Sequence, residues 1–182
     1  HQSDTPIVLR FTKGKYHFYP TAALEREYYI SNHDQTNPKS TGIPLEGLKN
    51  LELDGQGAEF IFHGRMLPLS LIDCENCTLK NFSVDFENPH ITQFKIIAND
   101  TIARKITFEV APWVKYKLDN GTFVAYGKDW QHTPEACIAF DENTRHIVFN
   151  TSDLRANFRQ VSESAPRTIV AENWKQTKLL PG

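Results

Sequence analysis

The chain has 182 residues, of which 40% are hydrophobic and 23% are charged, and its formal net charge is -2. This length suits one domain or two small ones, and the balance of residue types is that of an ordinary globular protein. The near-neutral charge, without a basic block, argues against a nucleic-acid partner. No apolar run approaches the roughly 20 residues of a membrane-spanning helix, so no membrane span is predicted.

Helical periodicity is scarce along the chain. The best helical candidate is the short segment Thr21–Tyr29, which Pro20 and Thr21 could start. Most other segments alternate apolar and polar residues in short runs between turn-forming residues, the pattern of β-strands. The aromatic content of 12% also suits a β-rich protein. The sequence therefore predicts an all-β fold.

The first half of the chain contains a repeat with an offset of 26 residues, which aligns KNLELDGQGAEF with ENCTLKNFSVDF. The aligned pairs are Asn50 with Asn76, Leu51 with Cys77, Leu53 with Leu79, Ala58 with Val84 and Phe60 with Phe86. Small or apolar residues thus recur at every second position, with a bend at Gly55 and Asn81. A period in the twenties with short strands predicts a parallel β-solenoid. KGKYHFYP and YYISNHD are candidates for a third, more degenerate unit that precedes these two.

The sequence pattern changes after Pro89, where the 26-residue repeat no longer occurs. Short alternating segments are joined by hairpin turns such as DNG, residues 119–121, and DENTR, residues 141–145. This pattern predicts a small antiparallel barrel or sandwich. We therefore expect the start of a parallel β-helix over residues 1–92 and a β-barrel-like domain over residues 93–182.

Gly55 and Gly57 do not make a phosphate loop, because AEFIFHG continues as a strand rather than as a helix. We expect these glycines to provide a positive φ or a close approach of two backbones. The CENC motif of Cys74 and Cys77 has the spacing of zinc and thioredoxin-like sites. It leads into a predicted strand, and no second Cys pair follows, so we expect neither a metal nor a redox role.

Three pairs of polar residues are candidates for ligand contacts. His63 and Arg65 flank Gly64, and strand alternation would place both side chains on one face. Asp85 and Glu87 occupy one strand face in VDFENPH, with their backbones about 6.5 to 7 Å apart. That separation resembles the carboxyl spacing of an inverting glycosidase. The alternative is that these are ordinary surface acids. In ISNHDQTNPK, His33 and Asp34 lie in a polar loop that either contacts a ligand or caps the end of the solenoid core.

The segments YYISNHDQ, GIPLEGLKNLELDGQGAEFIFHGRMLP and LKNFSVDFENPHITQ, in this order, resemble the N-terminal coils of glycoside hydrolase family 110, the bacterial α-1,3-galactosidases. The resemblance covers residues 18–93 well. It implies a right-handed parallel β-helix that is interrupted by a smaller β-barrel insertion. It also implies release of terminal α-1,3-linked galactose from glycans, including blood group B-type structures, with inversion at the anomeric carbon. It further implies that no metal or organic cofactor is needed and that the protein is exported to the periplasm or the cell surface.

The members of this family are longer than this chain, and the resemblance places their catalytic carboxylates in later coils. The chain closes on KLLPG, residues 178–182, a turn signal before another element. We therefore expect an N-terminal portion that is inactive alone and that self-associates through an exposed coil end. The candidate sugar contacts are His33, Asp34, His63, Arg65, Asp85 and Glu87.

Two other function classes remain open from the sequence. One is a non-catalytic carbohydrate-binding or adhesin-like β-solenoid, which would bind glycans without turnover. The other is a polysaccharide lyase on a β-helix scaffold, a chemistry that commonly uses calcium. The acids of this chain are scattered, and the sequence contains no Asp-rich calcium loop. The lyase therefore ranks third.

Overall fold

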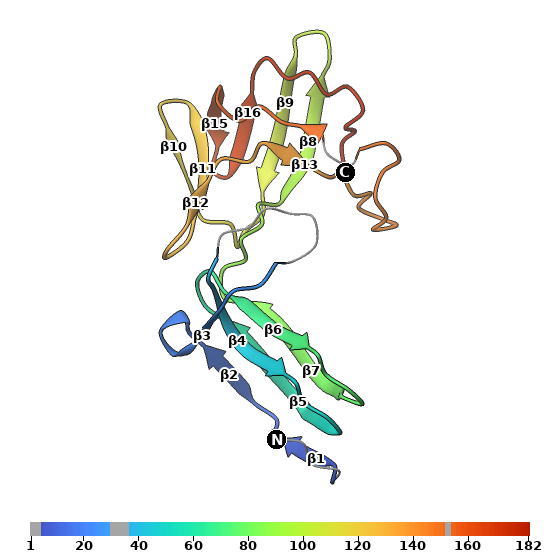
Figure 1. Cartoon of the computed structure of the whole chain (residues 1–182). Coiled ribbons are helices and arrows are strands. Elements are labelled where there is room, and N and C mark those ends of the chain that lie inside the picture. Colours follow the sequence, from blue (N-terminus) through green and yellow to red (C-terminus); the bar gives the residue numbers. More distant parts are fainter. Residues whose placement is uncertain (1–4, 30–36, 152–153) are drawn as a thin grey trace. The chain divides into compact units, whose positions relative to one another are not determined.

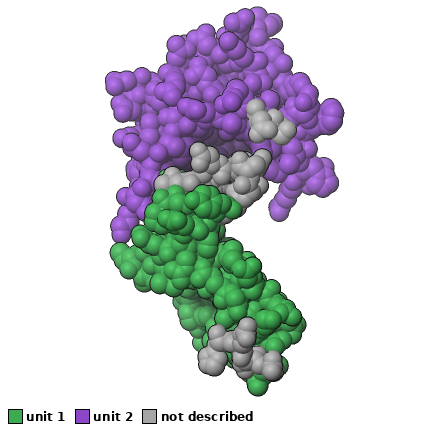
Figure 2. Space-filling model, viewed as in Figure 1, with its two compact units in different colours: residues 1–89 green, residues 90–182 purple. Residues whose placement is uncertain are grey.

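A computed structural model describes residues 5–29, 37–151 and 154–182. It divides into two compact units, residues 1–89 and residues 90–182, which Figures 1 and 2 show. The boundary expected from the sequence lies between residues 92 and 93. Both units consist of β-strands, and the one helical segment of the described residues is the short 3-10 turn η1, Pro20–Ala22. The chain is therefore all-β, as its alternating pattern predicts.

Unit 1 contains two sheets. The first comprises β1 (Ile7–Arg10), β2 (Lys15–Phe18), β5 (Leu51–Phe62) and β7 (Thr78–Phe86). The second comprises β3 (Leu24–Arg26), β4 (Lys39–Glu46) and β6 (Leu67–Ile72). All pairings are parallel except that of β3 with β4. The chain alternates between the sheets, from β4 to β5 and from β6 to β7 (Figure 1).

The helical candidate Thr21–Tyr29 does not form an α-helix. This segment instead contains the end of η1 and the strand β3, which pairs antiparallel with the start of β4. Isolated helices shorter than about 12 residues are marginal in water. The backbone hydrogen bonds that β4 offers therefore outweigh the weak helical preference of nine residues.

The 26-residue repeat is confirmed as a structural register, but only over part of its length. Thr41 lies opposite Leu67 in the second sheet, and Leu53 lies opposite Leu79 in the first. Beyond Asp54 the offset falls to 24, so the predicted pairs Ala58 with Val84 and Phe60 with Phe86 are wrong. The observed partners are Ala58 with Phe82, Phe60 with Val84 and Phe62 with Phe86. The cause is a bulge, because β5 has residues 55–57 where β7 has Asn81 alone.

Both glycines of this bulge serve the backbone, as the sequence predicts. Gly57 has a φ of +83°, which L-residues with a side chain rarely adopt. At Gly55 a Cβ atom would lie 2.5 Å from Phe82 Cβ and 2.7 Å from the carbonyl oxygen of Asn81. A side chain here would therefore collide with the neighbouring strand. Because glycine has no Cβ atom, β5 and β7 can approach each other closely at position 55.

Aromatic rings fill the interior of unit 1. Phe60 and Phe62 are fully buried, and Phe62 stacks on Phe18 with a centroid distance of 4.6 Å. Phe82 stacks on Phe60 at 4.9 Å. Phe18 and Phe62 are register partners, whereas Phe82 lies opposite Ala58 and reaches diagonally to Phe60. Burial of such large apolar groups is the main favourable term for this unit.

Polar side chains join the corner between β4 and β5 to the corner between β6 and β7, and we call these contacts the polar ladder. The Asn76 side-chain amide donates to the Asn50 side-chain oxygen at 2.7 Å, and both residues have positive φ, near 51° and 55°. The ammonium of Lys49 lies 2.5 Å from the Glu75 carboxylate at the same level. Cys74 and Cys77 are half-buried beside this ladder, and their thiols donate to the carbonyls of Leu45 and Leu48.

Unit 2 is built from antiparallel strands. One sheet has the order β15-β16-β9-β8, a second has the order β10-β11-β12, and β13 pairs with β14. The strands are β8 (Phe94–Asp100), β9 (Lys105–Val110), β10 (Tyr116–Asp119), β11 (Thr122–Tyr126), β12 (Gln131–His132), β13 (Ala136–Cys137), β14 (Leu154–Arg155), β15 (Val161–Ala165) and β16 (Thr168–Ala171). The predicted turn at Asn120 and Gly121 joins β10 to β11, and both residues have positive φ. The core includes Phe108, Phe123, Phe158 and Trp174.

One arginine holds the segment after β9 in unit 2. The Arg167 guanidinium donates to the carbonyls of Val110 at 3.1 Å and Val114 at 2.9 Å, and also to Ala111. It lies 5.4 Å from the centroid of the Tyr116 ring. The Tyr116 hydroxyl donates to a carboxylate oxygen of Glu163 at 2.5 Å. Burial, aided by this hydrogen bond, raises the pKa of Tyr116 to about 12.

The close approach at Gly55 leads to a first prediction. Substitution Gly55→Ala should destabilise unit 1 by about 1 to 3 kcal/mol, because the new methyl group overpacks the strand contact. Gly14→Ala is the matched control, since a Cβ there would meet nothing within 4 Å. Urea denaturation of both variants measures the difference. Equal midpoints for the two variants would contradict the close approach.

The Tyr116 hydroxyl leads to a second prediction, on alkaline stability. Because its folded-state pKa lies near 12 and the unfolded value is about 10, the neutral phenol stabilises the fold fully below about pH 10. That contribution is lost as the pH rises toward 12. Tyr116→Phe should therefore show a shallower fall of the urea midpoint between about pH 10 and pH 12 than the parent chain. Tyr29→Phe, at a side chain that is 87% exposed, should behave like the parent. Identical slopes for Tyr116→Phe and the parent would count against this account.

Candidate functional site

Three parallel strands of unit 1 end at the same level. Phe18, Phe62 and Phe86 are the last residues of β2, β5 and β7, and they lie opposite one another in register. The hydrogen-bond ladder continues for one further residue. The His63 N–H donates to the Phe18 carbonyl at 2.9 Å, and the Glu87 N–H donates to the Phe62 carbonyl at 3.0 Å. The next residues of the three strands, Tyr19, His63 and Glu87, therefore meet at one edge of the sheet.

His63 is the centre of a cluster of rings at this edge. Its Nε2 lies 2.8 Å from Nδ1 of His17, and its ring stacks on Tyr19 with a centroid distance of 4.2 Å and an interplanar angle of 15°. His63 is half-buried, whereas His17 and Tyr19 are exposed. The stacked arrangement fixes the His63 ring on one side by Tyr19 and at its edge by His17. We call His17, Tyr19 and His63 the ring cluster.

The sequence reasoning missed His17 and Tyr19. The available signal was the alternation in KYHFYP, which places these two residues on the face opposite Phe18. The position of these two residues beside His63 could not be predicted from the repeat, because β2 pairs with β5 at an offset other than 26 residues.

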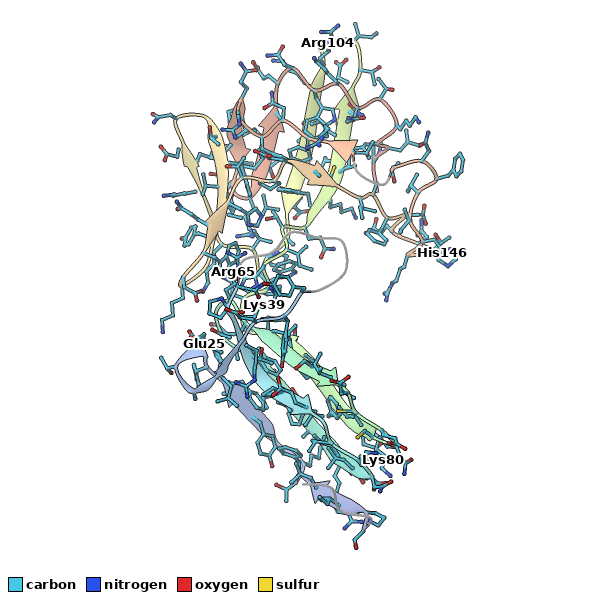
Figure 3. All side chains as sticks on the ribbon, viewed as in Figure 1. Glu25, Lys39, Arg65, Lys80, Arg104 and His146 are labelled. Atoms are coloured by element: carbon cyan, nitrogen blue, oxygen red, sulfur yellow. The ribbon has the colours of Figure 1, made fainter. Side chains whose placement is uncertain are left out.

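The predicted strand face shared by His63 and Arg65 is wrong. Residues 63–66 form a turn between β5 and β6, and Gly64 has a φ of 65°. The chain must leave the first sheet after Phe62 and enter the second sheet at Leu67, so strand alternation does not apply. Arg65 is exposed on this turn, and Figure 3 places it at the same end of unit 1 as Lys39 and at the opposite end from Lys80.

Asp85 and Glu87 lie on the strand next to His63. Asp85 faces Ile61 in register, and Ile61 faces His17, so these three residues form one row across the outer face of the sheet. Glu87 follows the last residue of β7. Both carboxylates are exposed, and an Asp85 oxygen accepts the Phe86 N–H at 2.8 Å. The edge thus combines aromatic faces with two anionic acceptors.

His33 and Asp34, the other two predicted contacts, lie outside the described residues. Four predicted residues therefore have a place in the structure, and the strand ends bring His63 and Glu87 to one edge, with Asp85 on the same strand as Glu87 and Arg65 on the following turn. Within the described ranges no group of three or more His, Cys, Asp and Glu side chains could hold a metal ion.

This edge presents an aromatic face beside hydrogen-bonding groups, a combination that suits a ligand rich in hydroxyl groups. The Tyr19 ring offers an apolar face, and the imidazoles and carboxylates offer donors and acceptors around it. Two cavities, of about 420 and 440 Å³, lie in unit 2, and neither is lined by the predicted residues of unit 1. Two of the three members of the ring cluster, His17 and Tyr19, are exposed, so the cluster lies at the surface of unit 1.

Comparison with known proteins places the second half of the chain in a defined family. The family model of the GLAA-B beta-barrel domain I matches residues 92–182. This match includes every strand of unit 2.

Among the described residues, no helix is long and apolar enough to cross a membrane.

Curated relatives match the chain over its length. It is 54% identical over 181 residues to alpha-1,3-galactosidase B of Parabacteroides distasonis and 56% identical over 183 residues to a protein of that name from Phocaeicola vulgatus, with 100% of the chain covered in both cases. It is 50% identical over 177 residues, 97% of the chain, to alpha-1,3-galactosidase B of Bacteroides fragilis. The chain spans 30%, 31% and 30% of the length of these three relatives, respectively.

The two comparisons agree with each other and with the resemblance seen in the sequence. A barrel-domain model covers unit 2, and the relatives extend the similarity through unit 1. The chain therefore belongs to the family of the GLAA-B β-barrel domain I and of the bacterial α-1,3-galactosidases, glycoside hydrolase family 110.

Proposed function

We propose that the chain is the N-terminal portion of an exo-acting, inverting α-1,3-galactosidase that releases terminal α-1,3-linked galactose from glycans, including blood group B-type structures. The observation that carries this proposal is the identity of 54% and 56% to two alpha-1,3-galactosidases B over all of the chain. The family resemblance adds export to the periplasm or the cell surface. Neither a metal nor an organic cofactor is part of the proposed reaction.

The architecture of unit 1 supports a role as scaffold in such an enzyme. We infer that its two sheets are the first coils of a right-handed parallel β-helix and that unit 2 is an inserted barrel. The parallel register of β4 with β6 and of β5 with β7 is what successive coils require. Apolar side chains at the open edges of β6 and β7, namely Leu71, Ile72 and Val84, are 41 to 43% exposed. A further coil would cover them.

The edge at the ends of β2, β5 and β7 would form part of the sugar cleft. Inverting hydrolysis needs a general acid and a general base, two carboxyl groups about 6.5 to 9.5 Å apart across the sugar. We assign these groups to later coils, so the fragment alone would be inactive. His33, Asp34, His63, Arg65, Asp85 and Glu87 would contact sugar hydroxyls, and the ring cluster would add an aromatic face through Tyr19. Such contacts orient the substrate rather than transfer protons.

A second function fits one observation. The Tyr19 side chain is 46% exposed while its ring is stacked on His63. A fixed, exposed aromatic ring is also what a non-catalytic carbohydrate-binding β-solenoid would present. This alternative predicts glycan binding without turnover, even by a longer protein. The β-helix polysaccharide lyase remains the third possibility.

Turnover of a blood group B trisaccharide tests the proposal. The 182-residue chain is assayed for galactose release beside a full-length protein that contains it. We expect release by the full-length protein alone, with the anomeric configuration inverted in the NMR spectrum of the first product. Glycan binding without release by either protein would favour the binding module, and neither release nor binding would overturn both functions.

The same assay tests the ring cluster. In the full-length protein, His63→Ala should lower kcat/KM about tenfold, since one hydrogen bond and one stacking contact together contribute about 1.4 kcal/mol. His146→Ala is the matched control, because His146 is exposed in unit 2 (Figure 3). An unchanged kcat/KM for His63→Ala would remove this edge from the substrate cleft.

The isolated chain should self-associate through the open edge of unit 1. Unpaired strand edges with exposed apolar side chains favour pairing with another copy. Val84→Lys places a charge on β7 and should shift the chain toward monomer in size-exclusion chromatography with light scattering. Ile102→Lys, in a turn where the side chain is 96% exposed, should leave the distribution unchanged. A clean monomer for the parent chain would contradict the prediction.

A further inference from the structure

Unit 2 contains a cavity that the proposed function does not use. We propose that it is a separate glycan-binding pocket, centred on Trp130 in the hairpin of β11 and β12. This inference goes beyond the proposed function because the pocket lies in unit 2 and needs no catalytic group. Its ligand would be one saccharide unit of a glycan.

The cavity is a depression that is open to solvent, with a volume of about 420 Å³. Its lining includes two aromatic residues together with polar and charged ones. The lining residues are Lys117, Tyr126, Gly127, Lys128, Asp129, Trp130 and Gln131. The other cavity, of about 440 Å³, is lined by residues 163–166 at a hairpin turn, and none of these residues is aromatic.

The hairpin that carries the pocket is closed by backbone hydrogen bonds. Tyr126 of β11 pairs with Gln131 of β12, and the Gly127 N–H donates to the Trp130 carbonyl at 2.8 Å. Lys128 and Asp129 therefore form the tip of a tight turn. This closure fixes the position of the Trp130 backbone relative to the two tip residues.

Two imidazoles support the Trp130 ring. His132 stacks on it with a centroid distance of 5.3 Å and an interplanar angle of 18°, and His90 meets it edge-on at 5.1 Å. His132 Nε2 is in turn 3.1 Å from the Thr92 hydroxyl. Neither histidine is among the residues that line the cavity. The two imidazoles and the apolar core of unit 2, against which Trp130 packs, thus hold the indole in place. A ring held in place before binding loses little entropy when a ligand arrives.

The lining fits a saccharide better than other ligand classes. A pyranose has one face of C–H groups, which packs on an indole, and a rim of hydroxyl groups. Lys117 and Lys128 are donors, and Gln131 is both a donor and an acceptor. A purely apolar ligand would leave these polar groups without partners, which costs free energy. The mixed lining therefore favours a neutral sugar, or one that carries a carboxylate within reach of the lysines.

Binding to the 182-residue chain tests the pocket. The chain is titrated with an α-1,3-galactosyl-terminated trisaccharide and, in a second arm, with 3'-sialyllactose, and both are followed by NMR. We expect millimolar or tighter binding of at least one probe and an affinity about tenfold lower in Trp130→Ala. Trp130→Phe keeps an aromatic ring and should retain most of the affinity. A dispersed NMR spectrum checks that each variant is folded.

Two controls separate this pocket from the ring cluster of unit 1. Trp113→Ala removes another partly exposed indole, and Tyr19→Ala removes the aromatic face proposed for the substrate cleft. Neither should change binding at the Trp130 pocket. Binding that is lost in Tyr19→Ala but kept in Trp130→Ala would overturn this inference and leave the proposed function standing. No binding of either probe at about 10 mM would also overturn it.

Discussion

The in-register pairing of three parallel strands, β2, β5 and β7, is the constraint on which unit 1 depends. In such a sheet every residue lies beside its counterpart, so one row of rings fills the interior and the next row faces outward. The bulge in β5 adjusts the register so that Phe62 and Phe86 still share a row. Because these strands end together, the residues after them meet at one edge, where His63 contacts Tyr19. The candidate site is thus a direct product of the packing register.

Much of unit 1 could be predicted from the sequence, since the 26-residue repeat is the register of β4 with β6 and of the first part of β5 with β7. The change to an offset of 24 could not be predicted, for a physical reason. Side chains alternate with a period of two, so a shift of two residues leaves each of them on the same face. Phe60 is buried whether its partner is Val84 or Phe86. An apolar pattern alone cannot distinguish the two registers.

The candidate site was harder to predict than the fold. Its acidic members, Asp85 on β7 and Glu87 just after it, stand out in the sequence by their spacing, and His63 by its place beside Gly64 and Arg65. His17 and Tyr19 do not, because β2 pairs with β5 at an offset of 44 residues, Lys15 with Glu59, rather than 26. The turn at Gly64 was read as strand, since alternation gives no sign of where a chain leaves one sheet for another. In unit 2 the Asn120–Gly121 turn is evident in the sequence, whereas His90, which meets the Trp130 ring edge-on, lies far from Trp130 in the sequence.

The asparagine ladder at the corner has a direction. Asn76 donates its amide hydrogen to the side-chain oxygen of Asn50, which leaves its own side-chain oxygen as an acceptor. A chain segment that stacks on this corner and brings a donor can therefore continue the ladder. An asparagine would extend the ladder, and an aspartate would set one acceptor against another. The hydrogen bond at this corner thus favours sequences that place a donor, rather than an acceptor, at the next position of the ladder.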